Sequence, residues 1–343
     1  MKKISAVLPL FITVILCISV FSVGVYAFFD EGEKTLPSSS FVSAGASPLK
    51  DESLLELFTA QNTDTSYEES SVAAGASPSD AVGKIYEQFI SPYKAGLSYN
   101  GVYIKNSTGL SVDLKSELAT RPDIKIENTA EPQVLIVHTH ATESYMNEER
   151  DYYTAADKAR STDNEFNVTK VGEVLAQVLR EGGIGVLHDR TQHDYPSYSG
   201  SYTRSAKTIN EYLKKYPSIK IVVDLHRDSI SSGENGKCKP TAEIDGKKAA
   251  QVMLVVGSET GSVSGFPNWR ENFRLAIRFQ QTMEALYPGF ARPVNFASRK
   301  YNMNLTKGSM LLEVGTDSNT LEEACYSAQL AGKALLCVLN TLK

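Results

Sequence analysis

One short stretch decides the fold of this 343-residue sequence, and it reads Val134-Leu135-Ile136-Val137-His138-Thr139-His140. Its first four residues form an uninterrupted apolar run, which is typical of a strand buried on both faces of a sheet. Two later runs have the same form: residues 219–225 end just before His226-Arg227-Asp228, and residues 310–312 end just before Glu313-Val314-Gly315. We therefore predict a sheet whose buried strands end in polar side chains.

Elsewhere the apolar spacing changes from that of strands to that of helices. Apolar residues recur at helical spacing within 167–181, 203–216, 271–287 and 320–342. Further strands are expected near 185–187 and 251–256, with a hairpin within 231–248. Strands that alternate with helices indicate an α/β domain over residues 132–343, in which a mostly parallel or mixed sheet is flanked by helices on both faces.

The first 29 residues have the composition of a membrane anchor. Lys2-Lys3 is followed by a stretch from Ile4 to Phe29 without a charged residue, and about 20 apolar residues span a bilayer. The lysine pair favours a cytoplasmic N-terminus. We therefore expect a cytoplasmic tip and a single transmembrane anchor over residues 1–29, with the rest of the chain outside the cell membrane. A signal peptide cleaved after Ala27 is the alternative, and the length of the apolar stretch favours the anchor.

Two segments separate this anchor from the α/β domain. Residues 30–84 are rich in Ser, Ala, Gly and acidic residues, a composition that cannot bury enough apolar area to fold, so we predict a disordered linker. Residues 85–131 are expected to form an ordered lead-in, with short strands near 99–104 and 110–114.

The overall composition narrows the class of partner. The formal net charge is -5 and no long basic run occurs, so we expect no nucleic-acid partner.

Of the four cysteines, Cys17 lies in the apolar N-terminal stretch. The spacing of Cys238, Cys325 and Cys337 fits no zinc framework, and we expect small buried side chains.

Two histidines and a glutamate at the strand ends suggest a zinc site. The carboxyl ends of the strands are where open α/β sheets bind ligands, and zinc accepts imidazole nitrogen and carboxylate oxygen. We predict His140 and His226 as ligands, with Glu143 as the third because it follows His140 at a spacing that one tight turn brings to the same ion. Asp163 is the rival third ligand, although its place before a predicted helix also explains it as a helix-start residue.

Two further side chains have the chemistry of a hydrolase. Glu313 ends a buried strand, so burial would raise its pKa, and we predict it to be the general base that moves the proton of the attacking water. Its alternative role is a structural ion pair with Arg227. Arg227 is predicted to hold a substrate carboxylate or to polarise a carbonyl oxygen.

The remaining polar residues near the strand ends have several open roles. His138 is a ligand, a hydrogen-bond partner of a ligand or a substrate contact, and we favour a role without the metal. Asp224 or Asp228 would accept a hydrogen bond from a metal-bound histidine, and Asp228 fits a loop cap equally well. His188, Asp189, His193 and Asp194 are interpreted as a solvated polar loop. Trp269, between Asn268 and Arg270, would line a groove or simply pack.

Five stretches resemble the stage II sporulation protein P family, which comprises membrane-anchored cell-wall hydrolases of endospore-forming bacteria. They occur in order within residues 132–343, and they are Val137 to Tyr145, Asn167 to Gly172, Val223 to Ser229, Pro267-Asn268-Trp269 and Leu311 to Gly315. The predicted anchor and linker agree with the layout of that family.

The resemblance implies a zinc amidase-like (phosphorylase/hydrolase-like) fold. The implied activity is that of a zinc N-acetylmuramoyl-L-alanine amidase with a related endopeptidase activity on peptidoglycan, working in spore engulfment. The implied partners are stage II sporulation protein D, a lytic transglycosylase, and stage II sporulation protein M, a membrane scaffold. The ligand set of more distant zinc amidases, with its catalytic glutamate, maps onto His140, His226 and Glu313. The middle ligand of that group comes from near Asp163 rather than Glu143.

Two other functions are compatible with the sequence. The spacing of His140 and Glu143 also occurs in zinc peptidases of the carboxypeptidase type, whose products would differ from those of an amidase. A non-catalytic wall-binding or scaffold protein would keep the fold without turnover, and its zinc content would reveal the difference.

Overall fold

The structure is a computed structural model, and it describes residues 77–343. The predicted anchor over residues 1–29 and most of the predicted linker lie outside the described residues. Within residues 77–343, no helix combines the length and the apolar character that crossing a membrane requires.

An eight-stranded mixed sheet forms the centre of the fold. Its strands lie in the order β2-β3-β11-β10-β12-β7-β4-β6. Their bounds are β2 Leu97–Tyr99, β3 Val102–Asn106, β4 Val134–Val137, β6 Val186–His188, β7 Ile221–Asp228, β10 Val252–Gly257, β11 Val294–Ala297 and β12 Gly308–Thr316. The strands β6, β4, β7 and β12 are parallel to one another, and β10 is antiparallel to β12. The predicted mixed sheet with alternating helices is therefore confirmed.

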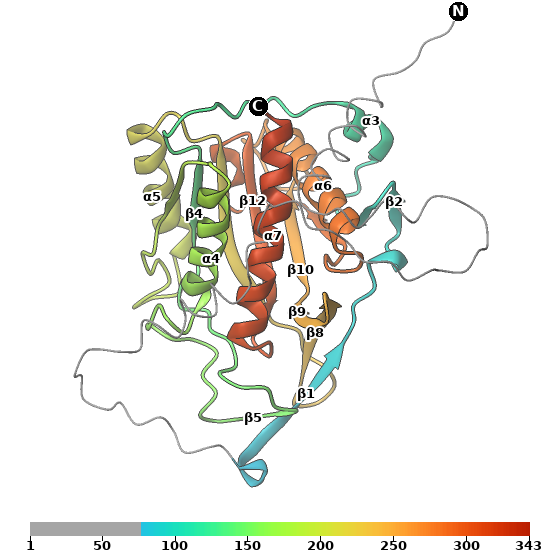
Figure 1. Cartoon of the computed structure of the whole chain (residues 1–343), viewed down its shortest axis with the longest axis vertical. Coiled ribbons are helices and arrows are strands. Elements are labelled where there is room, and N and C mark those ends of the chain that lie inside the picture. Colours follow the sequence, from blue (N-terminus) through green and yellow to red (C-terminus); the bar gives the residue numbers. More distant parts are fainter. Residues whose placement is uncertain (1–76) are drawn as a thin grey trace, which may run out of the picture. The chain divides into compact units, whose positions relative to one another are not determined.

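Three helices cover one face of this sheet, and a fourth lies on the other. Figure 1 shows α4 (Val168–Glu181), α6 (Trp269–Leu286) and α7 (Leu321–Thr341) in front of the sheet. Their apolar side chains share the main core with Val134, Ile136 and Leu225. On the opposite face, Ile209 of α5 (Ser201–Lys215) packs with Leu135, Val137 and Val222. Neighbouring strand residues point to opposite faces, and these two groups of core residues accordingly lie on opposite faces of the sheet.

Local sequence signals explain where these helices begin. The side chain of Asn167 accepts a hydrogen bond from the Thr169 backbone N–H and starts α4. Thr320 and Glu323 form a capping box at the start of α7, in which each side chain binds the other's backbone N–H. Such caps satisfy the backbone N–H groups that the first turn of a helix leaves without partners.

A second, four-stranded sheet has the order β5-β1-β8-β9. It consists of β1 (Ala81–Gln88), β5 (Tyr152–Thr154), β8 (Gly236–Ile244) and β9 (Lys247–Ala250). The hairpin predicted within 231–248 is β8 with β9. The strand β1 begins at Ala81, so the boundary predicted at residue 84 is wrong, because this segment pairs with β8 and β5 instead of remaining a linker.

The predicted lead-in also differs from the structure. Residues 97–106 form a hairpin at Asn100-Gly101, where both residues have positive φ, and β3 pairs with β11 of the central sheet. The boundary at residue 131 therefore does not separate two sheets. The strand expected near 110–114 is absent, because Asp113 caps the helix α3 (Leu114–Ala119) instead.

The register of the parallel strands sets the position of the candidate site. Val137 of β4 pairs with Asp224 of β7, and His226 of β7 pairs with Glu313 of β12. Paired residues in a parallel sheet point to the same face. The strand ends therefore place His226 and Glu313 side by side.

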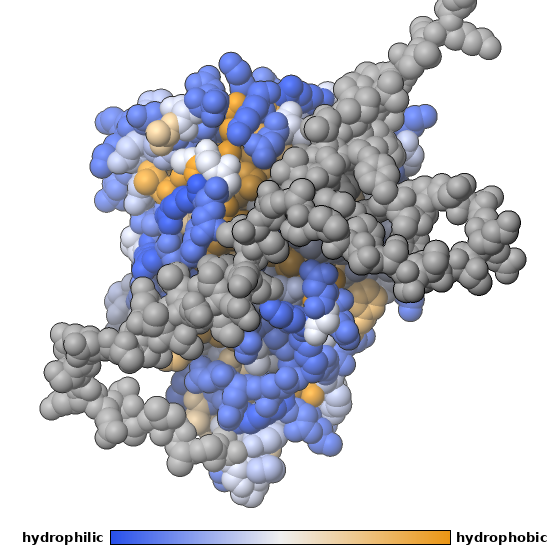
Figure 2. Space-filling view, viewed as in Figure 1, coloured by the Kyte–Doolittle hydropathy of each residue, from blue (hydrophilic) through white to orange (hydrophobic). Residues whose placement is uncertain are grey.

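The outer surface in view is mainly hydrophilic, with hydrophobic residues gathered in a few places (Figure 2).

Close packing between α4 and α7 predicts the effect of a bulky residue at Gly332. A Cβ at this position would lie 2.9 Å from side-chain atoms of Val178. We expect Gly332→Val to lower the free energy of unfolding by about 1–3 kcal/mol, the usual cost of overpacking a core. Urea denaturation measures this difference. Lys333→Val, at the exposed neighbouring position, is the control; equal stability of both variants would contradict the packing described.

Candidate active site

The site is built around His226, which lies between two carboxylates. Its Nε2 is 2.9 Å from Asp224 Oδ1, and its Nδ1 is 3.4 Å from Glu143 Oε2. All three side chains are buried. Burial alone would lower the pKa of His226, but Asp224 and Glu143 raise this pKa well above its usual value. Without a metal, His226 therefore carries a proton that a bound cation would replace.

A turn after β4 brings Glu143 to His226. The Glu143 backbone N–H donates to the carbonyl oxygen of His140 (3.2 Å), and the Arg227 backbone N–H donates to Glu143 Oε2 (3.2 Å). Burial would raise the pKa of Glu143, but His226 and Arg227 outweigh it and hold the pKa below its usual range. Glu143 is therefore an anion in the folded chain, as a metal ligand must be.

His140 completes a group of three possible ligands. Its ring lies 5.2 Å from that of His226, measured between ring centroids, and its buried Nδ1 has no hydrogen-bond partner. Burial and the neighbouring His226 lower the pKa of His140, so its imidazole is neutral and able to bind a metal. On its other side, the ring of Tyr198 stacks on His140 at 4.4 Å.

Glu313 faces this group from β12. Its side chain keeps some exposure, while Oε2 is buried without a hydrogen-bond partner. Burial raises the pKa of Glu313 to about 8; Glu143 and Asp228 add to this shift, whereas His226 opposes it. A carboxyl group with this pKa can hold or release a proton near neutral pH.

The donor set fits zinc in its chemistry. Two imidazoles and one carboxylate are common zinc ligands, and His140 Nδ1 is a buried nitrogen without a hydrogen bond. The side chains are close but not convergent: within residues 77–343, no group of three or more His, Cys, Asp or Glu side chains has the arrangement of a formed metal centre. His226 lies in contact with Glu143.

His138 lies on the other face of the sheet, toward α4. Its Nδ1 is 2.9 Å from the carbonyl oxygen of Leu225, and its Nε2 is 2.8 Å from His188 Nε2. His188 in turn lies 2.8 Å from Glu173 of α4. His138 and His140 do not share a side, because β4 ends at Val137 and the chain turns. The buried His138 supports the strand that carries His226.

Arg227 also differs from its predicted role. Its Nε donates to the carbonyl oxygen of Ser144 (3.0 Å), and its Nη2 donates to that of Ala159 (2.6 Å). The buried guanidinium thus holds two backbone segments rather than facing a substrate. The same hydrogen bonds to backbone carbonyl oxygens argue against the alternative role of Arg227, a structural ion pair with Glu313.

Of the remaining carboxylates, only Asp224 directly supports a candidate ligand. Besides contacting His226, it accepts hydrogen bonds from the Thr139 backbone (2.8 Å) and hydroxyl (2.6 Å). Asp228 forms an ion pair with Arg292 (2.9 Å) and accepts from the Ser229 backbone. Asp163 is exposed and accepts from the Glu165 backbone, as a turn residue does.

The four residues interpreted as a solvated polar loop have buried side chains, namely His188, Asp189, His193 and Asp194, so this interpretation is wrong, although Arg190 and Thr191 between them are exposed. His193 Nδ1 is 2.9 Å from the carbonyl oxygen of His138, and its Nε2 is 2.9 Å from the Thr208 hydroxyl. Asp194 accepts hydrogen bonds from Thr142 and Arg160. The sequence signal was the concentration of hydrogen-bonding side chains directly after β6, which lies beside β4.

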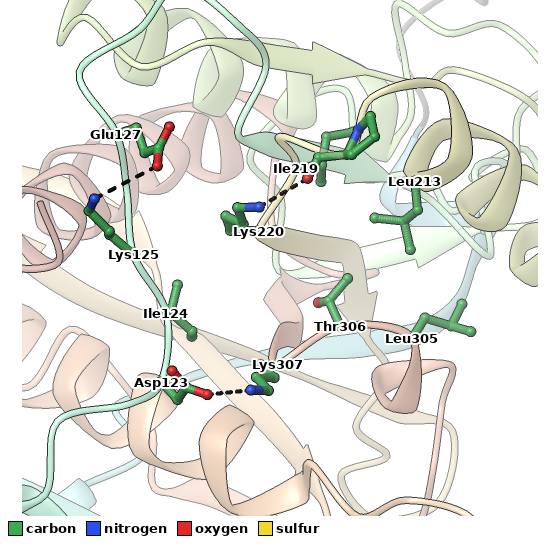
Figure 3. A pocket seen from close by; sticks show the side chains of 11 residues that line it. Asp123, Ile124, Lys125, Glu127, Leu213, Ile219, Lys220, Leu305, Thr306 and Lys307 are labelled. Atoms are coloured by element: carbon green, nitrogen blue, oxygen red, sulfur yellow. Dashed lines mark hydrogen bonds and ion pairs between the residues drawn. The ribbon is translucent and has the colours of Figure 1, made fainter.

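Trp269 packs in the core and does not line a groove at the site. Its ring lies 5.7 Å from Phe296 and 6.5 Å from Phe273. A cavity of about 630 Å³ lies elsewhere, where Lys220 and Lys307 precede β7 and β12 (Figure 3). This cavity is at the opposite end of the strands from His226 and Glu313, and its lysines interact with Pro217 and Asp123.

The pKa of Glu313 predicts how the stability of the metal-free chain depends on pH. An unfolded glutamate titrates near 4.5 and the folded one near 8, so between these values the folded state binds one more proton and stability falls as pH rises. Glutamine at 313 is always neutral and removes this fall. In the presence of chelator, we expect Glu313→Gln to gain stability over the native chain by on the order of 3 kcal/mol between pH 5 and 9.

Thermal or urea denaturation of both proteins across this pH range measures the effect. Glu148→Gln, an exposed carboxylate, serves as the control and should follow the native curve. Parallel curves for the native chain and Glu313→Gln would contradict the raised pKa.

Comparisons with known proteins agree on the family. Residues 52–335 match the family model described as stage II sporulation protein P. The stage II sporulation protein P of Bacillus subtilis (strain 168) is 33% identical over 209 residues, which cover 58% of this chain and 49% of that protein. The match thus spans about half the length of this curated relative.

Two solved amidase structures are among those to which the chain has a weak similarity. The N-acetylmuramoyl-L-alanine amidase AmiC2 of Nostoc punctiforme has a TM-score of 0.35 and 11% identity, covering 63% of this chain and 98% of that one. The CwlD amidase from Clostridioides difficile, solved in complex with the GerS lipoprotein, has a TM-score of 0.38 and 10% identity, covering 61% and 98%. The family model matches most of the sequence, and the chain therefore belongs to the stage II sporulation protein P family.

Proposed function

We propose that this chain is a zinc-dependent peptidoglycan hydrolase that cleaves the amide between N-acetylmuramic acid and L-alanine during spore engulfment. The observation that carries the proposal is the grouping of His140, Glu143 and His226 beside Glu313, a carboxyl group with a pKa of about 8. Membership of the stage II sporulation protein P family supports the role in sporulation. A related endopeptidase activity on peptidoglycan cross-links belongs to the same proposal.

In this proposal, His140, Glu143 and His226 hold the zinc ion. When bound, zinc would polarise the amide carbonyl and lower the pKa of a bound water toward about 7. Asp224 keeps the His226 ring in place through the contact with Nε2, and carboxylates in this position orient ligand histidines and raise their basicity. The hydrogen bond from the Arg227 backbone keeps Glu143 turned toward His226.

Glu313 moves the proton. As a carboxylate it accepts a proton at Oε2 from the attacking water, and as the acid it returns this proton to the leaving amine of L-alanine. The pKa of about 8 favours the protonated form near neutral pH in the metal-free chain. A neighbouring cation would lower that pKa and so favour the carboxylate that the first step needs.

The N-terminal segment supplies the location in this proposal. Residues 1–29 anchor the chain in the membrane as a single span, and the following polar linker lets the outer domain reach the cell wall. Stage II sporulation proteins D and M are proposed partners on the basis of the family resemblance. Protease protection of the intact chain in membrane vesicles, compared with detergent-treated vesicles, tests which side carries the domain.

Two variants test the proposed roles of the ligands and the base. Glu313→Gln should retain zinc but lose hydrolysis by about 100-fold or more, because general acid–base catalysis contributes at least this much. His140→Ala should lose both zinc and hydrolysis. The measurements are zinc content and mass spectrometry of purified peptidoglycan digests, in which stem peptides with a free N-terminal L-alanine identify amidase cleavage.

The digest also separates the alternatives. Glu148→Gln, which changes an exposed carboxylate, is the control and should behave as the native chain does. Normal hydrolysis by Glu313→Gln would remove its role as the base. Products cut only within the peptide would identify a peptidase, and absence of both zinc and products would indicate a binding protein.

A further inference from the structure

Arg160, Arg227 and Arg292 lie near Glu143 or Glu313, and they differ in accessibility. The head groups of Arg227 and Arg292 are buried. Arg227 binds backbone carbonyls, and Arg292 pairs with Asp228. The side chain of Arg160, in contrast, is 42% exposed. Of these three arginines, Arg160 therefore has the side chain that is most open to solvent.

Arg160 is held in place by the segment that carries Glu143. Arg160 and Glu143 form an isolated antiparallel β-bridge. Beside it, the Ser161 backbone N–H donates to the carbonyl oxygen of Thr142 (2.8 Å). Nη1 of Arg160 donates to Asp194 (2.6 Å) and to the Thr142 hydroxyl (3.0 Å). The guanidinium thus has a fixed orientation, which reduces the entropy lost when it binds a ligand.

The rest of the guanidinium lies beside Glu143 and Tyr198. The hydrogen bonds of its head group in the described chain start from Nη1, while Nη2 lies 3.8 Å from Glu143 Oε1. Its Cζ is 4.8 Å from the ring centre of Tyr198, which is 57% exposed and stacks on His140. An oriented cation beside an exposed aromatic ring thus adjoins two candidate ligands.

The charge around the site gives this cation a function. The guanidinium of Arg160 lies beside the carboxylates of Glu143 and Asp194, and a third carboxylate, Asp224, contacts His226. An anionic substrate would therefore meet repulsion at this site unless a cation received it. An arginine binds a carboxylate through paired N–H···O bonds. One residue of extended peptide spans only about 3.5 Å, so a group one residue beyond the scissile amide is within reach of Arg160.

We propose that Arg160 binds a free carboxylate one residue beyond the scissile amide and thereby selects acidic peptide stems. This inference deepens the proposed function and rests on it for the identity of the scissile bond. It also transfers to Arg160 the substrate contact that the sequence suggested for Arg227.

The test compares two ligands that differ in one group. In N-acetylmuramoyl-L-alanyl-γ-D-glutamyl-L-lysine the α-carboxylate of the glutamate is free, and in N-acetylmuramoyl-L-alanyl-D-isoglutaminyl-L-lysine this group is a carboxamide. The γ-carboxyl group forms the next peptide bond in both ligands. We expect the native, zinc-loaded chain to prefer the acid by about tenfold or more in kcat/KM, as for a charged hydrogen bond. Arg160→Gln should remove the preference, and Arg160→Lys should restore part of it.

A matched control separates binding from a general effect on the fold. Arg190→Gln changes an arginine of similar exposure (48%) that pairs with Glu173 at 2.7 Å on the α4 side, and it should keep the native preference. NMR titration of Glu313→Gln, with and without Arg160→Gln, measures the same preference in binding without turnover. If Glu313→Gln binds the acid more tightly than the amide and the native, zinc-loaded chain hydrolyses neither ligand, the proposed function is overturned while the role of Arg160 stands.

The proposal is overturned by any of three results. These are equal affinity of the native chain for the two ligands, equal losses for both ligands in Arg160→Gln, and binding of neither ligand. The second result would show that Arg160 only supports Glu143 and Asp194.

Discussion

The contact of one imidazole with two carboxylates organises this site. His226 lies between Asp224 and Glu143, and each carboxylate reaches it from a different part of the chain. Asp224 is on the same strand and is fixed by Thr139, whereas Glu143 arrives through the turn after β4. Burying three ionisable groups together is stable only when their charges compensate. The positive charge that Asp224 and Glu143 favour on His226 offsets part of their negative charge, and the cluster as a whole stays suited to a cation.

The surrounding hydrogen bonds serve that cluster. Asp194 and Arg160 hold the turn that contains Thr142 and Glu143, and Arg227 ties the same turn to the next loop. On the far side of the sheet, His138 contacts the carbonyl oxygen of Leu225, the residue just before His226. Residues on both faces of the sheet thus help to position the side chains at the carboxyl ends of the strands. This explains why polar residues that never contact a substrate are buried so close to the site.

The elements with strong periodicity could be predicted from the sequence, because burial alone specifies them. The buried run before His138 and the helix from 168 to 181 needed no tertiary knowledge. The strand Ala81–Gln88 was missed because its pairing with β8 joins residues about 150 positions apart. The same limit applied to the site. The strand ends predicted the grouping of His140, His226 and Glu313, but the direction of the Arg227 side chain and the exposure of Arg160 depend on loop contacts that no local pattern reveals.

The central proposal is that His140, Glu143 and His226 bind one zinc ion. Competitive zinc titration of the native chain, Glu143→Gln and Asp163→Asn tests it most directly, because it compares the buried carboxylate beside His226 with the exposed one. The account predicts one zinc per chain, a loss of affinity of more than about 100-fold in Glu143→Gln, since even residues behind the ligands contribute up to this much, and native affinity in Asp163→Asn. Native affinity in Glu143→Gln with loss in Asp163→Asn would contradict the site described.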